Sequence, residues 1–346
     1  MSARASVVPV FVPHLGCPHD CVFCNQRRIA GQEEPLGASE LLALLQALDE
    51  TDEWRQLAFY GGSFTAIPVE QQLMLLEAAR WGLRAGKIQT IRLSTRPDAI
   101  DGAVLDRLHD YGVETIELGA QSMDDEVLRL SGRGHSAQDV REASRMICEA
   151  GFSLVLQMMT GLPGDTPEKD LKTARELIAL RPQGVRIYPT VVVKDTALFD
   201  LWRAGKYRAQ SVEEAVEICA KLLPLFDAAA IPVIRLGLNP TEALSSGDAV
   251  AGAYHPALGE LVKSRVLREK MAVLLQGLPA GSRVLLAAPE RQLSQALGQG
   301  RCNVQALEER FALRELKIVS HTGEAGQLRL LSVEKPDQTD GKTQRI

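Results

Sequence analysis

The chain has 346 residues, of which 45% are hydrophobic and 24% charged, and its formal net charge is −5. This composition is typical of a folded globular protein with room for one large domain and a small one. No apolar run is long enough to span a bilayer, and the N-terminus lacks the apolar stretch of a signal peptide, so we expect a cytoplasmic protein that does not enter a membrane. Six cysteines in a chain of this length do not indicate a disulfide framework.

Short β-branched or apolar runs recur along the first 240 residues, and an amphipathic stretch follows most of them. The expected strands are 7–12, 56–60, 88–94, 113–118, 153–159, 184–192 and 231–236. The expected helices are 39–50, 69–85, 101–110, 136–150, 166–180 and 211–229. Such alternation predicts parallel strands joined by right-handed crossovers, and six or seven units are too few for a closed eight-stranded barrel. We therefore expect an α/β fold, a partial and open TIM-like barrel.

The C-terminal part of the sequence predicts a small α/β extension. Its expected helices are 259–276, 291–298 and 303–311, and its expected strands are 282–287, 315–319 and 327–333. The domain organisation that follows is a core over 1–250, a small domain over 251–334, and a disordered tail over 335–346.

Three cysteines lie close together after the first expected strand. Cys17, Cys21 and Cys24 have the spacing C-x3-C-x2-C. Three thiolates on one loop can bind three irons of a 4Fe–4S cluster and leave the fourth iron open to another ligand. A structural zinc site is the alternative, because zinc also binds thiolates and a histidine, His14 or His19, is close enough in sequence to complete it.

Glycine, hydroxyl and amide residues collect where the other expected strands end. In barrels of parallel strands, the chemistry takes place at these carboxyl ends. The segments concerned are Gly61-Gly62-Ser63, Thr95-Arg96-Pro97-Asp98, Gln121-Ser122, Gln157 with Gly161-Leu162-Pro163-Gly164, and Tyr188-Pro189-Thr190. Their placement on one rim favours a cofactor site and makes zinc the weaker interpretation.

Together with Arg133-Gly134-His135, these segments resemble those of the radical SAM (S-adenosylmethionine) superfamily. The resemblance covers roughly residues 7–240 and is greatest to a bacterial group similar to the catalytic subunit of Elongator, with oxygen-independent coproporphyrinogen III oxidase a more distant match. It implies a radical SAM enzyme with a 4Fe–4S cluster held by Cys17, Cys21 and Cys24. It also implies reductive cleavage of SAM to a 5′-deoxyadenosyl radical, with electrons from an external flavodoxin- or ferredoxin-like donor.

The resemblance further implies which residues contact SAM. Phe23 would offer its backbone to the adenine, and Arg133 would bind the carboxylate. Gln157 stands where the coproporphyrinogen oxidase pattern has an aspartate for the ribose. The full set of expected SAM contacts is Phe23, Gly61, Gly62, Ser63, Thr95, Gln121, Arg133 and Gln157.

Charge is distributed unevenly between the two parts of the chain. Residues 261–346 carry 14 Lys or Arg against 9 Asp or Glu, whereas residues 1–260 carry 25 against 35. A basic segment on an acidic body indicates a polyanionic partner. Together with the resemblance to the Elongator-like group, it leads us to expect RNA, tRNA in particular, as the substrate. The candidate docking residues are Lys263, Arg265, Arg268, Lys270 and Arg301. Alternatively, these cations pair with the acidic body and hold the segment in place.

Other functions stay open from the sequence. A radical SAM oxidoreductase acting on a small molecule or tetrapyrrole is one, and a non-catalytic, metal-stabilised RNA-binding module is another. The catalytic subunit of Elongator carries an acetyltransferase domain after its radical SAM part. No acetyl-CoA loop is recognisable after position 240 here, so we expect this domain to be lacking.

Overall fold

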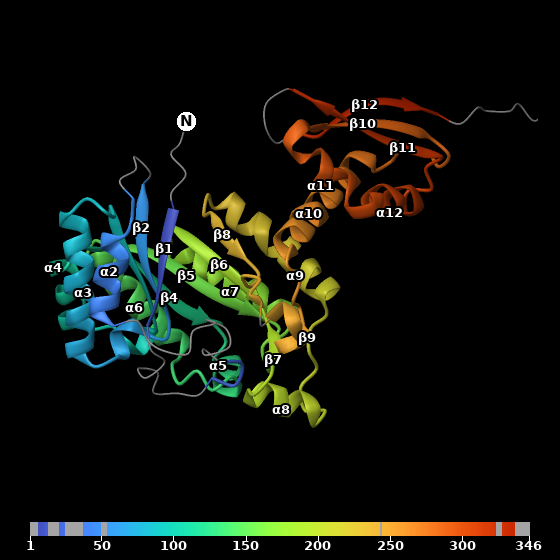
Figure 1. Cartoon of the computed structure of the whole chain (residues 1–346). Helices are drawn as coiled ribbons and strands as arrows, with labels where there is room; N and C mark the ends of the chain where they lie inside the picture. The colour runs from blue at the N-terminus through green and yellow to red at the C-terminus, as the bar shows by residue number, and fades with distance from the viewer. Residues whose placement is uncertain are drawn as a thin grey trace, which may run out of the picture. The chain divides into compact units, whose positions relative to one another are not determined.

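The computed structural model describes residues 6–12, 21–24, 37–49, 54–242, 244–322 and 327–335. The chain divides into two compact units (Figure 1). The first comprises Met1–Ile218 and Leu222–Pro256, and the second comprises Cys219–Lys221 and Ala257–Ile346. The domain limits expected from the sequence stay a prediction, and residues 336–346 of the expected tail lie outside the described residues. Within the described ranges, no helix is both long and apolar enough to cross a membrane.

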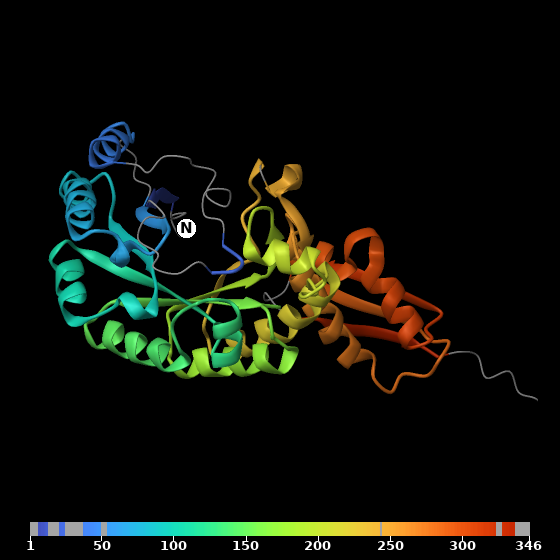
Figure 2. The ribbon, with the colours of Figure 1, turned by 90° about the horizontal axis from the view of Figure 1, so that it is seen from below.

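Seven parallel strands form the sheet of the first unit. They are β1 Ser6–Val12, β2 Arg55–Gly61, β3 Thr90–Thr95, β4 Val113–Gln121, β5 Ser153–Thr160, β6 Gly184–Pro189 and β8 Val233–Leu236. They pair in the order β1-β2-β3-β4-β5-β6-β8, so β1 and β8 are the two edges of the described sheet. The sheet curls into a half-barrel, which confirms the predicted open TIM-like fold (Figure 2).

Helices cover the outer, convex side of the half-barrel (Figure 2). The α-helices are α2 Ala38–Gln46, α3 Val69–Arg84, α4 Gly102–Asp110, α5 Asp125–Leu130, α6 Ala137–Glu149, α7 Pro167–Ala179, α8 Ala197–Arg203 and α9 Val212–Ala228. Short 3₁₀ turns, η2 Phe64–Ala66 and η3 Pro97–Ala99, follow β2 and β3. The sequence missed α5 and α8, because helices of 6 and 7 residues are too short for a helical repeat to show.

The sixth predicted strand, 184–192, is wrong as a single element. Pro189 ends β6, and the next residue, Thr190, directs both its N–H and its hydroxyl to the carbonyl of Thr160 at 2.9 and 2.7 Å. Proline has no N–H for a further ladder bond, so the chain leaves the barrel sheet here. The short strand β7 Val191–Val193 then pairs antiparallel with β9 Ala249–Gly252.

The strands of the half-barrel have an apolar side and a polar side. Residues such as Phe59, Ile116 and Ile187 are fully buried. The residues next to them along the strands are polar, and Tyr60, Glu117 and Arg186 line a cavity. Successive residues of a strand point to opposite faces, so the concave side of the sheet is polar while its other side packs against helices. A barrel interior is usually filled with branched apolar side chains, and this one is not.

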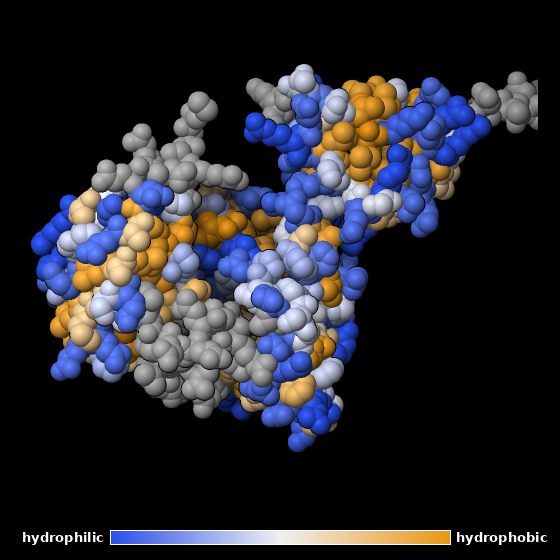
Figure 3. All heavy atoms as spheres, in the orientation of Figure 1, coloured by the Kyte–Doolittle hydropathy of each residue, from blue (hydrophilic) through white to orange (hydrophobic). Residues whose placement is uncertain are grey.

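The second unit is a small α/β fold of the kind that the sequence predicts. Its sheet has the order β11 Glu315–His321, β10 Arg283–Pro289, β12 Arg329–Glu334, with helices α10 Leu258–Leu275, α11 Leu293–Leu297 and α12 Cys302–Arg310. An apolar core joins them through Met271, Leu286, Leu307 and Leu316, among others. Hydrophobic side chains also appear on the surface over β10 and β12 in Figure 3. Strand β12 contains Leu330 and Leu331, which are 40% and 52% exposed.

The segment 298–303, which is rich in glycine, is a turn that starts α12. Its 3₁₀ turn, η6 Gln299–Arg301, brings Asn303 into the core, where it is 2% exposed. The side-chain amide nitrogen of Asn303, Nδ2, donates to the backbone carbonyls of Ser264, Gln295 and Ala296. These bonds give the segment a structural role in joining α10, α11 and α12.

Candidate active site

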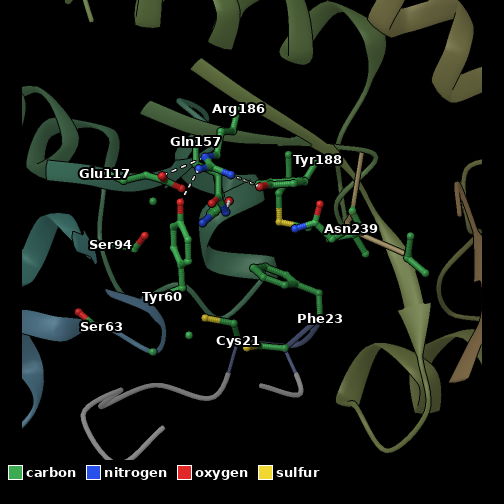
Figure 4. A pocket seen from close by; sticks show the side chains of 18 of the residues that line it. Cys21, Phe23, Tyr60, Ser63, Ser94, Glu117, Gln157, Arg186, Tyr188 and Asn239 are labelled. Carbon is green, nitrogen blue, oxygen red and sulfur yellow. Dashed lines mark hydrogen bonds and ion pairs between the residues drawn. The ribbon is translucent and has the colours of Figure 1, made fainter. Parts of the chain in front are cut away.

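A cavity of ≈ 340 Å³ lies on the concave side of the half-barrel, at the carboxyl ends of its strands (Figure 4). Every described residue that the sequence analysis assigned to the cluster or to SAM lines it. These residues are Cys21, Phe23, Cys24, Gly61, Gly62, Ser63, Thr95, Gln121, Arg133 and Gln157. Cys17, the remaining assigned residue, lies outside the described residues. Segments that are dispersed over the first half of the chain therefore meet at one place.

The turn that carries Cys21 and Cys24 is attached to the barrel rim on two sides. The N–H of Val22 donates to the carbonyl of Ser131 at 3.1 Å, and the carbonyl of Val22 accepts from the N–H of Leu198 at 2.7 Å. Cys21 is buried and Cys24 half-buried, and neither forms a disulfide. The short helices α5 and α8, which the sequence missed, thus hold the cysteine turn.

Arg133 links the cysteine turn to the end of β4. Its Nη1 donates to the Sγ of Cys21 at 3.4 Å and its Nη2 donates to the carbonyl of Gly119 at 2.7 Å. Its Nε is buried and has no hydrogen-bond partner within the described structure. A guanidinium that is only 7% exposed, with a donor still unused, is suited to bind an anionic ligand.

The backbone of Arg133 is itself fixed by the Thr95-Arg96-Pro97-Asp98 segment. The Nη2 of Arg96 donates to the carbonyl of Arg133, while its Nε donates to the carboxylate of Asp98 at 2.7 Å. Burial alone would raise the pKa of Asp98, but the hydrogen bond and charge of Arg96 outweigh it, and the pKa is lowered. Asp98 therefore stays ionised and holds Arg96 in place.

Hydroxyl groups form a chain behind the glycine segment. The Oγ of Ser63 and the Oγ1 of Thr95 lie 2.9 Å apart, and Thr95 also bonds the hydroxyl of Thr65. Gly61, just before this chain, has φ +101°, and a Cβ there would lie 3.0 Å from the carbonyl of Val12. Only glycine combines this conformation with so close a neighbour, and its absent side chain leaves backbone exposed to the cavity.

Two amide side chains form the next part of the wall. The Nε2 of Gln157 donates to the Oε1 of Gln121 at 3.1 Å. Gln121 has φ +64°, a conformation that costs energy for a residue other than glycine and is concentrated at functional sites. A Cβ at Gly119 would lie 2.9 Å from the Nε2 of Gln121 and 3.2 Å from the Nη2 of Arg133. Gly119 thus makes room for two side chains of the site.

The sequence analysis missed a second polar group on the same cavity wall. Arg186 lies at its centre, with Nε 2.9 Å from the Oε2 of Glu117, and with Nη1 and Nη2 donating to the hydroxyls of Tyr188 and Tyr60 (Figure 4). The available signal was a charged residue inside each of two parallel strands that are otherwise buried. The sequence pattern does not show which charged side chains lie next to one another. Predicting this group would therefore require the register of the sheet.

Burial and pairing act against each other in this group. Burial raises the pKa of Glu117, although Arg186 and Arg92 favour its charged form. Burial disfavours the charged form of Arg186, but the carboxylate of Glu117 more than compensates, so the pKa of Arg186 is raised. Arg186 is therefore a permanent cation, and burial raises the pKa of Tyr188 so that this phenol keeps its proton.

His135 is a buried neutral group beside the site. Its Nε2 lies 3.2 Å from the carbonyl of Ala120, and the side chain is 6% exposed. Burial, together with the charge of Arg133, lowers the pKa of His135 from 6.5 to about 4. At neutral pH the imidazole is uncharged, so it supports the loop of Arg133 without adding charge to the pocket.

Two family matches cover most of the described chain. Residues 11–177 match the Radical SAM superfamily, and residues 182–268 match the Radical_SAM C-terminal domain. The first match contains the cysteine turn and all expected SAM contacts. The chain belongs to the radical SAM superfamily, whose members are enzymes that use a 4Fe–4S cluster and SAM.

Within this superfamily, the chain is similar to Elongator-type proteins. It is 30% identical over 237 residues to tRNA uridine(34) acetyltransferase of Dehalococcoides mccartyi, which covers 58% of this chain and 52% of that protein. It is 29% identical over 272 residues to human Elongator complex protein 3, which covers 65% of this chain and 50% of that protein. The chain thus spans about half the length of the curated relatives it matches.

A solved structure supports the fold. The archaeal Elp3 of Methanocaldococcus infernus superposes with a TM-score of 0.61 at 23% identity, over 77% of this chain and 63% of that chain. This likeness concerns the arrangement of helices and strands. It agrees with the open half-barrel described above.

Proposed function

We propose that the pocket of the half-barrel binds a 4Fe–4S cluster and SAM, and that the protein uses them to modify RNA, tRNA in particular. The observation that carries this proposal is the meeting of Cys21, Cys24 and all eight expected SAM contacts around one cavity. Family membership supports the chemistry, because radical SAM enzymes share this cofactor pair.

Cys17, Cys21 and Cys24 would hold the cluster. The two that belong to the described residues form a turn that is tied to the rim by backbone hydrogen bonds, which suits a site that must keep its ligands close together. When bound, the cluster and SAM would supply an electron and a hydrogen-abstracting 5′-deoxyadenosyl radical.

The residues around the cavity fit the polar groups of SAM. Arg133 offers an unused, buried donor for the carboxylate, and Gly61, Gly62 and Ser63 expose backbone and hydroxyl for the amino group. The Oε1 of Gln157 remains available to accept from a ribose hydroxyl, because its Nε2 is the atom that bonds Gln121. The departure of Gln157 from aspartate is therefore compatible with a ribose contact.

Apolar side chains that line the same cavity would exclude water from the reaction. Met159, Val191, Val193 and Leu244 are each at most 9% exposed and line the cavity. Phe23 packs with Tyr188 against the cluster of Val127, Met159 and Leu162. A reactive radical needs such shielding, since contact with solvent or exposed side chains would divert it.

The RNA substrate and the partners are inferred from similarity. The matched relatives are named for tRNA uridine and for Elongator, and the two family matches, over residues 11–177 and 182–268, contain every residue that lines the cavity. We propose tRNA as the substrate, a flavodoxin- or ferredoxin-like electron donor, and the reducing cytoplasm as the compartment that an exposed cluster requires.

Comparison of modified nucleosides tests the RNA function. Total tRNA from a strain that lacks the gene should miss one modified nucleoside, and expression of the wild-type chain should restore it. Expression of the Cys21→Ala variant should not. An identical nucleoside profile in the deletion strain would contradict the proposed substrate and favour a small molecule.

A further inference from the structure

Arg186, Glu117, Tyr60 and Tyr188 form a network on the cavity wall that the expected SAM contacts do not use (Figure 4). The Nη1 of Arg186 donates to the hydroxyl of Tyr188 at 3.2 Å, and its Nη2 donates to the hydroxyl of Tyr60 at 2.9 Å. Its Cζ also lies 5.4 Å from the ring centroid of Tyr60. One guanidinium thus sets the position of two phenol groups from different strands, β2 and β6.

The direction of these hydrogen bonds leaves two donors unused. A guanidinium can only donate, so each phenol oxygen acts as an acceptor toward Arg186, and its own O–H must point elsewhere. Among the residues that the structure describes, neither O–H has an acceptor. Both tyrosines line the cavity. The cavity wall therefore offers two O–H donors in fixed positions to a ligand.

The charges around the network also favour an electron-rich ligand. Glu117 is the one carboxylate among the described cavity-lining residues, and Arg186 occupies it at 2.9 Å. Arg92 approaches the same oxygen to 3.8 Å, so two cations surround one anion. On this wall the cations outnumber the carboxylate, and one oxygen of that carboxylate, Oε2, is ion-paired with Arg186.

We propose that Tyr60 and Tyr188, held by Arg186, form a subsite for a carbonyl or carboxylate oxygen of the substrate. This inference rests on the proposed function, because it concerns the group that lies beside SAM in the same cavity. An sp² oxygen has two lone pairs and can accept from both phenols at once. An amino group at that place would give neither phenol O–H an acceptor, which is the kind of mismatch that binding sites discriminate most strongly.

The subsite predicts a preference between compounds of similar shape. A pyrimidine with an oxygen at C4 presents such an acceptor, whereas the same ring with an amino group at C4 presents only donors at that position. A small carboxylate offers the same acceptor and also a negative charge. The two arginines beside Glu117, Arg186 and Arg92, would favour that charge. The apolar residues nearby, Val191, Val193 and Leu244, would contact the flat face of either ligand.

Binding of three probes to the unreduced, SAM-loaded holoenzyme tests the subsite. The probes are uridine, cytidine and benzoate, measured by equilibrium dialysis. If the ligand group is a neutral carbonyl, uridine should bind at least about tenfold more tightly than cytidine; if it is a carboxylate, benzoate should be the tightest. Tyr60→Phe and Tyr188→Phe, which remove only the hydroxyls, should each weaken the preferred probe about tenfold.

Tyr111→Phe is the matched control, because Tyr111 ends α4 and does not line the cavity. It should bind the probes as the wild type does. Thermal melting of all three variants shows whether a loss of binding comes from unfolding. Wild-type protein that binds no probe, or tyrosine variants that bind like the wild type, would overturn the subsite. Failure of the RNA function appears separately, as an unchanged nucleoside profile in the deletion strain.

Discussion

The concave side of the half-barrel and the core of the second unit differ in how fully their buried polar groups are hydrogen-bonded. Around the cavity, the Nε of Arg133 and the Oγ of Ser94 are buried without a hydrogen-bond partner in the described structure. In the second unit, the buried side-chain amide of Asn303 makes several hydrogen bonds. Unpaired buried donors cost stability unless a ligand meets them, so those at the cavity suit a bound ligand, whereas the described part of the second unit has one unpaired buried polar atom, the Oε1 of Gln292.

The largest effect is expected at Gly119, because two side chains of the site lie where its Cβ would be. Gly119→Ala should displace Gln121 and Arg133 and reduce the rate of SAM cleavage by about 10²-fold, the order expected from an error of about 1 Å in positioning. The assay is formation of 5′-deoxyadenosine by the reduced holoenzyme. Gly102→Ala is the control, since nothing lies within 4 Å of a Cβ there and its activity should not change. Full activity of Gly119→Ala would mean that these two side chains do not contact SAM.

Arg133 should contribute strongly to SAM affinity if it binds the carboxylate. Arg133→Ala removes a charge-assisted hydrogen bond and should weaken SAM binding by about 1.5–3 kcal/mol, which isothermal titration of the cluster-loaded protein would detect. Arg129→Ala changes an exposed arginine on the neighbouring helix α5 and should leave the affinity as it is. Equal affinities of the two variants would reduce Arg133 to a structural residue.

His135 makes the stability of the site region depend on acid. Its pKa is about 4 in the folded chain against 6.5 in its ordinary state, so the unfolded chain binds more protons between these values. Its contribution to stability is complete above pH 6.5 and declines as the pH falls toward 4, by at most about 3 kcal/mol. The drop in melting temperature between pH 7 and pH 4.5 should therefore be smaller for His135→Gln than for the wild type. His109→Gln, at an exposed position, should behave like the wild type.

The smallest effect is expected from the basic residues of the second unit. The RNA-docking role of Lys263, Arg265, Arg268, Lys270 and Arg301 stays a prediction. Three of these cations have acidic partners within their own helix: Lys263 lies 3.0 Å from Glu260, and Arg265 and Arg268 lie 3.1 and 3.8 Å from Glu269. Because such surface pairs contribute less than about 1 kcal/mol, replacing Arg265 and Arg268 with alanine should change the melting temperature little. A weaker dependence of tRNA affinity on salt concentration in that double variant would support the docking role. An unchanged dependence would contradict it.

The sequence was sufficient for the features that depend on local pattern. Alternation of strands and helices predicted the open half-barrel, and the residues expected to contact the cluster or SAM all line the cavity, apart from Cys17 outside the described residues. These inferences succeed because parallel strands bring their carboxyl ends to one edge whatever their exact register. The roles of the individual SAM contacts stay predictions, although the geometry around Arg133 and Gln157 is compatible with them.

Features that depend on long-range pairing could not be predicted. Arg186 contacts Glu117 and Tyr60 because β6, β4 and β2 curl around one cavity. The local sequence of these three strands does not predict which of their side chains pair. The departure of the chain at Pro189 depends on Thr190 finding the carbonyl of Thr160 on the neighbouring strand. The substrate subsite proposed here belongs to this second kind of feature.

Metal and SAM analysis of one preparation tests the central claim most directly. Protein reconstituted anaerobically should contain about four irons and four sulfides per chain, and after reduction it should cleave SAM to 5′-deoxyadenosine and methionine. Cys21→Ala should lose the cluster and this activity, while Cys148→Ala, a change at an exposed cysteine, should keep both. Stoichiometric zinc without sulfide in the wild-type protein, together with no cleavage of SAM, would contradict the account.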